Sequence, residues 1–391
     1  MEKLWKYKKI GEVCIVERGA SPRPIDKYIT DNESGINWIK IGDTSDSMYI
    51  TETAQKIIVE GMKKSRYVKP GDFLLSNSMS FGRPYILKID GCIHDGWLVL
   101  RDENALFDKR FLYYYLSSKT TYKKLKSMAV GGVVNNLNSE MVRNVIVPVP
   151  DKEEQSEIAD LFDKIKKILD DRKQELEQLD TLVKSRFVEL FGDPVINSRG
   201  WKKALIGDDC FVTKLAGFEY TQYINYEDSG DVVMVKAQNV KNGKLNRKEL
   251  SFISNEVSDS LPRSQLAPGD VVMTYVGANI GDVAIIDNEY KYHLAPNVAK
   301  IRPDSERYNS IYFMYMLMLL NAYIVKNSAD TAKAALGMER IRKLNVFVPP
   351  IELQNQFADF VASVDKSKSK IQKSLEETQL LFDSLMQKYF G

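Results

Sequence analysis

Apolar positions recur at helical spacing along residues 150–192, which contain no glycine or proline between the first residue and the last. The apolar side chains recur at alternating steps of three and four residues, the spacing of a helix that packs against a partner helix. These seam positions are Ile158, Leu161, Ile165, Ile168, Leu176, Leu179, Val183, Phe187 and Leu190, with Arg172 in the break between them. About 38 helical residues span roughly 55 Å. Such a helix needs a partner to bury its apolar stripe.

The predicted partner lies in the same chain, at residues 349–391. The two stretches align without a gap at an offset of 199 residues, so that Gln155 matches Gln354 and Ala159 matches Ala358. The second stretch continues the seam at Phe357, Val364, Ile371, Leu375, Thr378, Phe382, Leu385 and Tyr389. Shared entry and exit residues at one offset favour two antiparallel arms of one coiled coil over two unrelated surface helices.

The regions that precede the two helices repeat as well. WKYKKIGEVC (residues 5–14) matches WKKALIGDDC (201–210), and VKPGDFLLS (68–76) matches LAPGDVVMT (266–274). Each member of the second pair reads as a Pro-Gly-Asp turn followed by a short apolar strand. His94 and His293 then fall at like places in the two copies. The chain is therefore predicted to run head, long helix, head, long helix.

These patterns predict an α+β fold, with two similar mixed α/β globular domains separated by two long antiparallel coiled-coil helices. The expected arrangement is pseudo-two-fold and almost circular. The predicted boundaries are residues 1–149 for the first head, 150–192 for the first helix, 193–348 for the second head and 349–391 for the second helix. Each head of about 150 residues is long enough for its own core.

Composition restricts the class of protein further. Three widely separated cysteines offer neither a disulfide framework nor a zinc-binding spacing, which indicates a reduced, cytoplasmic setting. The N-terminal residues lack the apolar core of a signal peptide, and the most apolar run, 311–325, is too short for a membrane span. A formal net charge of +2 means that any affinity for nucleic acid must come from locally sorted charge.

Together these motifs resemble the specificity subunit of a type I restriction–modification system. The residues that carry the resemblance are VPVP-x3-EQ-x2-IA before the first long helix and VPP-x2-LQ-x2-FA before the second. FGDP-x5-GW leads into the second head, and a Pro-Gly-Asp element stands in each head. Leu353 and Phe357 depart from Glu154 and Ile158 at matching positions. The resemblance covers the whole chain, and its specificity lies in the repetition of short motifs in one order at one spacing.

The resemblance implies a non-catalytic subunit that recognises double-stranded DNA. Each head would be a target recognition domain that reads one half of a bipartite, asymmetric site, and the helix pair would set the spacing and receive two methyltransferase subunits. Restriction (translocase) subunits would join through the methyltransferase. The chain itself would bind no cofactor, because S-adenosylmethionine, ATP and Mg²⁺ are expected on the partner subunits.

Base-specific contacts are expected from Arg, Lys, Asn, Gln, Ser and Thr side chains on loops that reach base edges. Candidates in the first head are Ser21, Arg23, Lys27, Asn77, Ser78, Ser80, Arg83, Asn135, Asn136 and Asn138. Candidates in the second head are Tyr220, Gln222, Tyr223, Lys236, Gln238, Asn239, Tyr275, Asn279 and Lys333. For any one of them the alternative is an ordinary solvated loop residue, and Arg23, Arg83 and Gln238 are the strongest candidates. The four tryptophans, Trp5, Trp38, Trp97 and Trp201, are expected to pack in the heads.

Motifs for catalysis are missing from the sequence. There is no G-x-x-x-x-G-K-[ST] phosphate loop and no Asn-Pro-Pro-aromatic run, the usual motif of amino-methyltransferases. The two histidines lie far apart, so they form neither a metal cluster nor a catalytic pair, and no catalytic or metal-binding residue is predicted.

Two other functions stay open at this point. One is a two-headed coiled-coil adaptor that holds protein partners without touching DNA, which the near-neutral charge favours slightly. The other is the detached recognition part of a fused restriction–methylation enzyme. Sequence-selective, salt-dependent DNA binding separates DNA recognition from the adaptor. Copurification with a separate methyltransferase separates the favoured reading from the fused enzyme.

Overall fold

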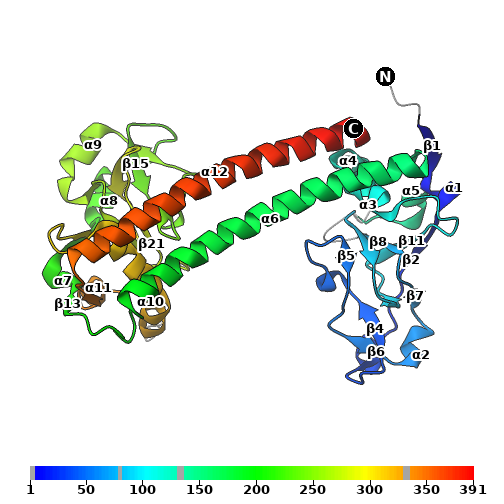
Figure 1. Ribbon diagram of the computed structural model, residues 1–391, viewed down its shortest axis with the longest axis horizontal. Helices are drawn as coiled ribbons and strands as arrows, with labels where there is room; N and C mark the ends of the chain where they lie inside the picture. The colour runs from blue at the N-terminus through cyan, green and yellow to red at the C-terminus, as the bar shows by residue number, and fades with distance from the viewer. Residues whose placement is uncertain (1–4, 78–81, 130–135, 329–334) are drawn as a thin grey trace. The chain divides into compact units, whose positions relative to one another are not determined.

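The computed structural model describes residues 5–77, 82–129, 136–328 and 335–391. Its contacts divide the chain into two compact units (Figure 1). Unit 1 comprises Met1–Lys173 with Lys373–Gly391, and unit 2 comprises Gln174–Gln372. The two predicted long helices are present as α6 (Lys152–Phe191) and α12 (Ile351–Phe390), each of 40 residues. Each helix therefore contributes one half of its length to each unit.

The head of unit 1 contains two five-stranded sheets, in the orders β2-β11-β8-β9-β5 and β3-β6-β4-β10-β7, and the two-stranded pair β1-β12. Its strands are β1 (Lys6–Lys9), β2 (Ile15–Arg18), β3 (Ile29–Thr30), β4 (Ile36–Ile39), β5 (Tyr49–Ile50), β6 (Lys56–Ile57), β7 (Arg66–Val68), β8 (Phe73–Ser76), β9 (Pro84–Leu87), β10 (Gly91–Ile93), β11 (Trp97–Arg101) and β12 (Ile146–Val149). Its helices are α1 (Ile10–Val13), α2 (Val59–Met62), α3 (Lys109–Ser117), α4 (Lys119–Ala129) and α5 (Ser139–Arg143), with 3₁₀ turns η1 (Ile25–Lys27) and η2 (Ile41–Asp43).

The head of unit 2 repeats this plan in four-stranded sheets, β14-β23-β20-β21 and β18-β15-β22-β19, with the pair β13-β24 and the small hairpin β16-β17. Its strands are β13 (Lys203–Leu205), β14 (Cys210–Lys214), β15 (Val232–Val235), β16 (Val240–Lys241), β17 (Lys244–Leu245), β18 (Phe252–Ile253), β19 (Gln265–Leu266), β20 (Val271–Thr274), β21 (Val283–Ile285), β22 (Lys291–Leu294), β23 (Val298–Pro303) and β24 (Asn345–Phe347). Its helices are α7 (Ile206–Asp209), α8 (Gly217–Tyr223), α9 (Asn255–Ser260), α10 (Ser310–Ser328) and α11 (Met338–Arg342), with 3₁₀ turns η3 (Ala237–Asn239) and η4 (Pro262–Ser264).

The predicted Pro-Gly-Asp turns have the same backbone conformation and the same hydrogen bonds in both heads. Gly71 and Gly269 both have φ of +90°, a left-handed conformation that glycine adopts without strain. Asp72, which follows Gly71, accepts hydrogen bonds from the Lys69 N–H at 3.0 Å and from Arg101 Nε at 3.2 Å. Asp270 accepts in the same way from the Ala267 N–H at 2.8 Å and from Arg302 Nε at 2.6 Å. The turn and the last residues of β11 or β23 are thereby fixed to each other.

The strand register aligns the two heads residue by residue and corrects one sequence interpretation. In the parallel pairs β4–β10 and β15–β22, Ile39 lies opposite Ile93 and Val235 lies opposite Leu294. Since Ile39 and Val235 precede the equivalent turns η2 and η3, Ile93 corresponds to Leu294 and the next residue, His94, corresponds to Ala295. The interpretation that His94 and His293 are equivalent was therefore wrong. The offset of 199 residues holds in the helices and fails here because the loops of the two heads differ in length.

Within each unit the long helices pack on each other and on their head. In unit 2, Phe187 lies against Phe357 with ring centroids 5.4 Å apart, and Asp180 forms an ion pair with Lys368. Moving along α6 from Asp180 to Phe187, the contacted residue of α12 moves back from Lys368 to Phe357. The two helices therefore run in opposite directions in this unit. In unit 1, Phe162 lies 5.4 Å from Phe382 and 5.0 Å from Tyr114 of α3.

One part of the predicted seam was wrong. Ile168, expected at the helix interface, is 42% exposed, whereas its neighbour Leu169 is buried. Phe162 is likewise fully buried, whereas Leu161 is only half-buried. Adjacent apolar pairs fit the three-four spacing in two registers, and α6 must bury a wider face because it contacts α3 as well as α12.

Candidate nucleic-acid interface

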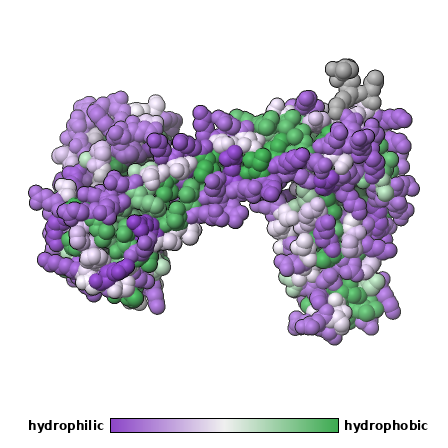
Figure 2. Space-filling model, viewed as in Figure 1, coloured by the Kyte–Doolittle hydropathy of each residue, from purple (hydrophilic) through white to green (hydrophobic). Residues whose placement is uncertain are grey.

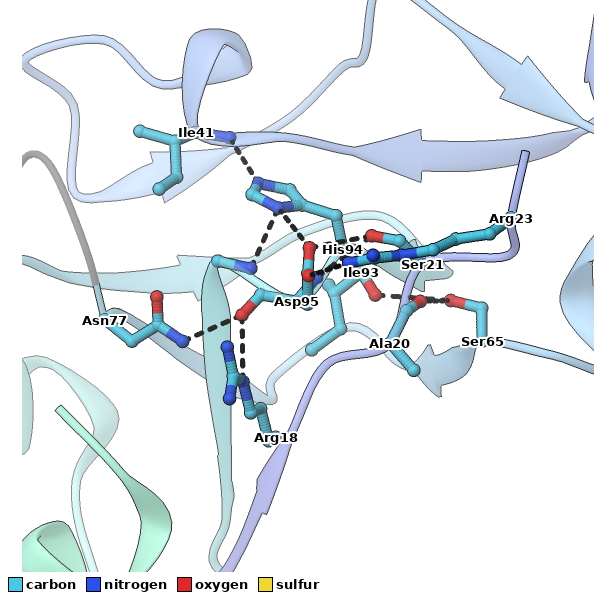
Figure 3. Close-up of polar contacts among 11 residues, drawn as sticks. Arg18, Ala20, Ser21, Arg23, Ile41, Ser65, Asn77, Ile93, His94 and Asp95 are labelled. Atoms are coloured by element: carbon cyan, nitrogen blue, oxygen red, sulfur yellow. Dashed lines mark hydrogen bonds and ion pairs between the residues drawn. The ribbon is translucent and has the colours of Figure 1, made fainter. Parts of the chain in front are cut away.

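The loop that follows β2 carries two of the predicted residues, Ser21 and Arg23, to Asp95, which follows β10 (Figure 3). Ser21 Oγ donates to Asp95 Oδ1 at 2.8 Å, and Arg23 Nη2 lies 3.3 Å from Asp95 Oδ2. Partial burial raises the pKa of the Asp95 carboxyl, but the hydrogen bond from Ser21 and the nearby positive charges outweigh it, so the net pKa lies below its ordinary value. Asp95 is therefore held as a carboxylate.

Other residues hold the backbone of Asp95 in place. Asn77 Nδ2 donates to the Asp95 carbonyl oxygen at 2.8 Å, and Arg18 Nε donates to the same oxygen at 3.1 Å (Figure 3). Asn77, a predicted base contact, is itself buried. Its side chain holds the Asp95 loop from the protein interior and does not face solvent.

The imidazole of His94 is fixed between two loops. Its Nδ1 lies 2.9 Å from the Gly96 backbone nitrogen and its Nε2 lies 3.2 Å from that of Ile41, and the neutral ring accepts a hydrogen bond at one of these two nitrogens. Burial lowers the pKa of His94 and thereby favours the neutral ring. The negative charge of Asp95 opposes this shift but does not outweigh it. The rings of Trp38 and Trp97 lie 6.4 and 6.2 Å away, and both tryptophans are buried, as the sequence predicts. His94 thus serves to join η2 to the Asp95 loop.

A cavity of about 440 Å³ opens over this arrangement. We call it the Asp95 cavity; its lining residues are Ser21, Pro22, Arg23, Ile25, Trp38, Lys40, Ile41, Gly42, His94 and Asp95. Lys40 is engaged, because its Nζ donates to Gln55 Oε1 at 2.8 Å. Of the predicted residues, Ser21 and Arg23 line the cavity, and Lys27 lies exposed at the end of η1 nearby in the sequence.

Arg83 occupies a different part of the first head. Its Nη2 donates to Asp46 Oδ1 at 3.0 Å, and its guanidinium lies 5.5 Å from the centre of the Tyr85 ring. The hydrogen bond from Arg83 lowers the pKa of Asp46. Asp46 also lines a groove of about 670 Å³ between the head, α3 and the long helices. The structure thus separates Arg83 from the group around Asp95.

The remaining described candidates of the first head lie at the start of α5. Asn138 is the N-cap residue, and its Oδ1 accepts from the Met141 N–H at 2.9 Å. Asn136 is half-buried two residues earlier. Ser78, Ser80 and Asn135 lie outside the described residues, as does Lys333 of the second head.

In the second head, the turn η3 presents Lys236 and Gln238 and is held by Asn239. The Lys236 N–H donates to Asn239 Oδ1 at 3.0 Å, just as the Lys40 N–H donates to Asp43 Oδ2 at 2.7 Å in the first head. Asn239 is buried, and its Nδ2 donates to the Asn246 carbonyl oxygen at 2.8 Å. Gln238 Nε2 donates to Glu249 Oε2 at 3.1 Å, at the surface. Gln238 is therefore displayed on a turn that Asn239 stabilises.

The other candidates of the second head lie on α8 and on the loop after β20. Gln222 and Tyr223 are exposed on α8, and the ring of Tyr220 lies 6.1 Å from that of Tyr226. Tyr275 is half-buried beneath Lys214, whose Nζ lies 5.5 Å from its ring centre. Asn279 is exposed on the same loop as Tyr275.

Asp95 is not among the residues predicted from the sequence, because the predicted contacts were Arg, Lys, Asn, Gln, Ser and Tyr side chains and Asp95 is a carboxylate acceptor. The signal available was its position directly after a buried strand, next to the single histidine of the first head. No group of three or more His, Cys, Asp or Glu side chains suited to a metal ion occurs among residues 5–77, 82–129, 136–328 and 335–391. In the same described ranges, no helix combines the length and the apolar character that crossing a membrane requires.

Comparison with known proteins identifies the family. Residues 2–179 and residues 199–378 each match the sequence model described as the type I restriction modification DNA specificity domain. This chain belongs to that family. Its two matched copies contain the two heads, each with part of a long helix.

Individual members of the specificity family resemble the chain over nearly its whole length. The type I restriction enzyme MjaVIII specificity subunit of Methanocaldococcus jannaschii is 23% identical, over 95% of this chain and 90% of that protein. The EcoKI specificity subunit of Escherichia coli is 20% identical, over 89% of this chain and 78% of that protein.

Solved structures share the fold. The type I restriction–modification S subunit from M. genitalium superimposes with a TM-score of 0.57 at 14% identity, over 99% of this chain and 96% of that chain. A structure from work on complex assembly and conformational transition of the type I system gives a TM-score of 0.64 at 17% identity, over 99% and 97% of the two chains.

Proposed function

We propose that this chain is the sequence-specific DNA-binding subunit of a type I restriction–modification complex, in which each head reads one half of a bipartite, asymmetric target. The observation that carries the proposal is the repetition of one frame with unlike loops. Four strands of each sheet share their order between the heads, and the Pro-Gly-Asp turns are common to both, whereas the loops that follow β10 and β22 carry His94-Asp95 and Ala295-Pro296. One scaffold with two sets of loops suits the reading of two different sequences.

The domain plan proposed for this function has target recognition domains at 1–149 and 193–348 and spacer helices at 150–192 and 349–391. We further propose a pseudo-two-fold arrangement of the two halves, nearly closed into a circle. A stiff helix pair between two readers converts helix length into base-pair separation, because B-DNA advances about 3.4 Å per base pair. Two linked readers also bind more tightly than either alone when the geometry fits both half-sites.

The long helices offer a docking surface for the methyltransferase subunits, of which we propose two. Leu380 and Leu381 of α12 are 70% and 51% exposed, and Figure 2 shows hydrophobic surface along the C-terminal part of this helix. Exposed neighbouring leucines on a helix are typical of a protein–protein contact. Restriction subunits would join through the methyltransferase.

In this proposal the chain is a non-catalytic, cytoplasmic protein. S-adenosylmethionine, ATP and Mg²⁺ are bound by the partner subunits, which supply methyl transfer and cleavage. The heads contribute affinity and sequence preference alone.

The test is binding by the full chain assembled with the methyltransferase subunits of its own system, using a pool of duplexes with randomised sequence. We expect selection of a split motif and an affinity that falls steeply as salt rises. A complex that retains no sequence preference at any salt concentration would exclude the proposal and favour the two-headed adaptor.

A further inference from the structure

The geometry around Asp95 suggests more than loop stability. Four side chains, Ser21, Arg23, Asn77 and Arg18, donate hydrogen bonds or an ion pair to this single residue. Its carboxylate nevertheless remains 42% exposed at the Asp95 cavity. The loop thus fixes a negatively charged acceptor and leaves it open to a ligand.

The two carboxylate oxygens of Asp95 differ in their hydrogen-bond partners. Asp95 Oδ1 accepts from Ser21, whereas Oδ2 pairs, among the residues that the structure describes, with Arg23, whose side chain is 82% exposed. An ion pair this exposed contributes little to stability and exchanges partners readily. Lys40 Nζ donates to Gln55, and the two ring nitrogens of His94 face backbone N–H groups. Asp95 Oδ2 and the guanidinium of Arg23 are exposed side by side at the cavity.

The walls of the cavity are apolar. Pro22 and Trp38 are buried, and Ile25 and Ile41 are half-buried. An apolar wall beside a fixed acceptor suits the flat edge of a heteroaromatic ring that carries an amino group.

The second head lacks this arrangement. The strand register places Ala295 and Pro296 where the first head has His94 and Asp95. The two heads therefore offer different chemistry at the same point of the frame.

We propose that Asp95 and Arg23 read one C·G base pair in the half-site bound by the first head. Asp95 Oδ2 accepts a hydrogen bond from the exocyclic amino group of cytosine, and Arg23 turns from Asp95 to donate to O6 and N7 of the paired guanine. These are the pairings that the major-groove edges of this base pair allow. The inference rests on the proposed function and specifies its chemistry in one head.

The experiment compares the wild-type chain with Asp95→Asn and Arg23→Ala, each assembled with the methyltransferase subunits and exposed to the randomised duplex pool. Asp26→Asn is the matched control, since it removes the same charge from an exposed residue of η1, close in sequence to Arg23, that lies outside the cavity lining. Sequencing of the bound duplexes reports the preference at every position of both half-sites.

We expect the wild-type motif to contain a C·G pair whose preference falls about tenfold or more in Asp95→Asn and in Arg23→Ala. The half-site read by the second head should stay unchanged, which shows in the same data that the variants are folded. Asp26→Asn should keep the whole motif. Ser21→Ala, which frees the carboxylate to rotate, should weaken the same position by a smaller factor.

Unchanged preference at every position in Asp95→Asn would overturn the inference and leave the proposed function intact. Relaxation at an A·T position would overturn the assignment to C·G. Loss of both half-sites in Asp95→Asn, with Ser21→Ala unchanged, would assign Asp95 to the fold and overturn the inference as well. A wild-type complex without any motif would instead exclude the proposed function itself.

Discussion

Gln155 Nε2 donates to the carbonyl oxygen of Pro150 at 2.9 Å, in the turn where the chain leaves the first head and enters α6. Its Oε1 accepts from the Asp108 N–H at 2.7 Å. Gln354 makes the same pair of bonds in unit 2, to the Pro349 carbonyl at 2.8 Å and from the Asn309 N–H at 2.9 Å. Both glutamines are fully buried. Each therefore joins its long helix to its head.

Removal of either glutamine should destabilise the unit to which it belongs. Gln155→Ala and Gln354→Ala each leave buried backbone groups without partners, which costs about 1–3 kcal/mol. Urea unfolding followed by circular dichroism measures the loss as a lower midpoint. Gln178→Ala, at an exposed position of α6, is the control and should leave the midpoint unchanged. Equal midpoints for Gln155→Ala and Gln178→Ala would contradict this role.

The position of the helix seam is tested by two adjacent residues of α6. Leu169→Ala removes a buried side chain and should cost about 2–5 kcal/mol. Ile168→Ala, at the neighbouring exposed position, should change stability by about 0.5 kcal/mol or less. Thermal unfolding of the two variants gives the comparison directly. A larger loss for Ile168→Ala would restore the register expected from the apolar spacing.

Lys300 should make stability depend on pH in the alkaline range. It is buried, its Nζ donates to the Gln265 carbonyl oxygen at 2.7 Å, and burial lowers its pKa from the ordinary value of 10.5 to about 8. Asp270 opposes this shift, and Arg302 and Arg263 add to it. Between pH 8 and 10.5 the unfolded chain therefore binds more protons at this site than the folded chain does, so stability rises with pH in that window.

The measurement is urea unfolding at several values between pH 7 and pH 10.5, for the wild type and Lys300→Met. The methionine removes the titrating group, so the difference in unfolding free energy between the two proteins should change steadily across the window. Lys248→Met, at an exposed lysine, should run parallel to the wild type. Parallel curves for Lys300→Met and the wild type would show that Lys300 keeps an ordinary pKa.

Arg83 remains a predicted base contact that lies apart from the Asp95 cavity. Arg83→Ala should cost about 1–3 kcal/mol of DNA-binding free energy and relax a single target position, provided that DNA displaces its ion pair with Asp46. The readout is the motif selected from the randomised pool. Asp46→Ala is the companion variant, because it removes the ion pair but keeps the guanidinium. Affinity and motif unchanged in Arg83→Ala would remove this residue from the candidates.

The proposed spacing role predicts the effect of lengthening both helices together. Seven inserted residues keep the seam in phase and add about 10 Å, which corresponds to about three base pairs. Insertion after Lys173 in α6 and after Gln372 in α12 should therefore widen the gap of the selected motif while both half-sites stay the same. An unchanged gap would show that the helices do not set the spacing.

The sequence alone determined the plan of repeated elements. The long helices without glycine or proline, the repeat of Gln155 at Gln354 and the Pro-Gly-Asp turns could be predicted, because each is visible in the spacing of residues along the chain. The burial of Trp38 and Trp97 was expected because tryptophan more often packs in a core than it faces a ligand.

Only the tertiary structure decided which residues far apart in the sequence lie next to each other. Asp95 became a candidate because strand pairing brings β10 beside β4 and the loop after β2 beside both, contacts between residues more than 50 positions apart. The same pairing showed that His94 corresponds to Ala295, and the packing of α6 buries Leu169 and leaves Ile168 exposed. Spacing along a chain fixes which face of an element is apolar, but the partner that covers this face is chosen by long-range packing.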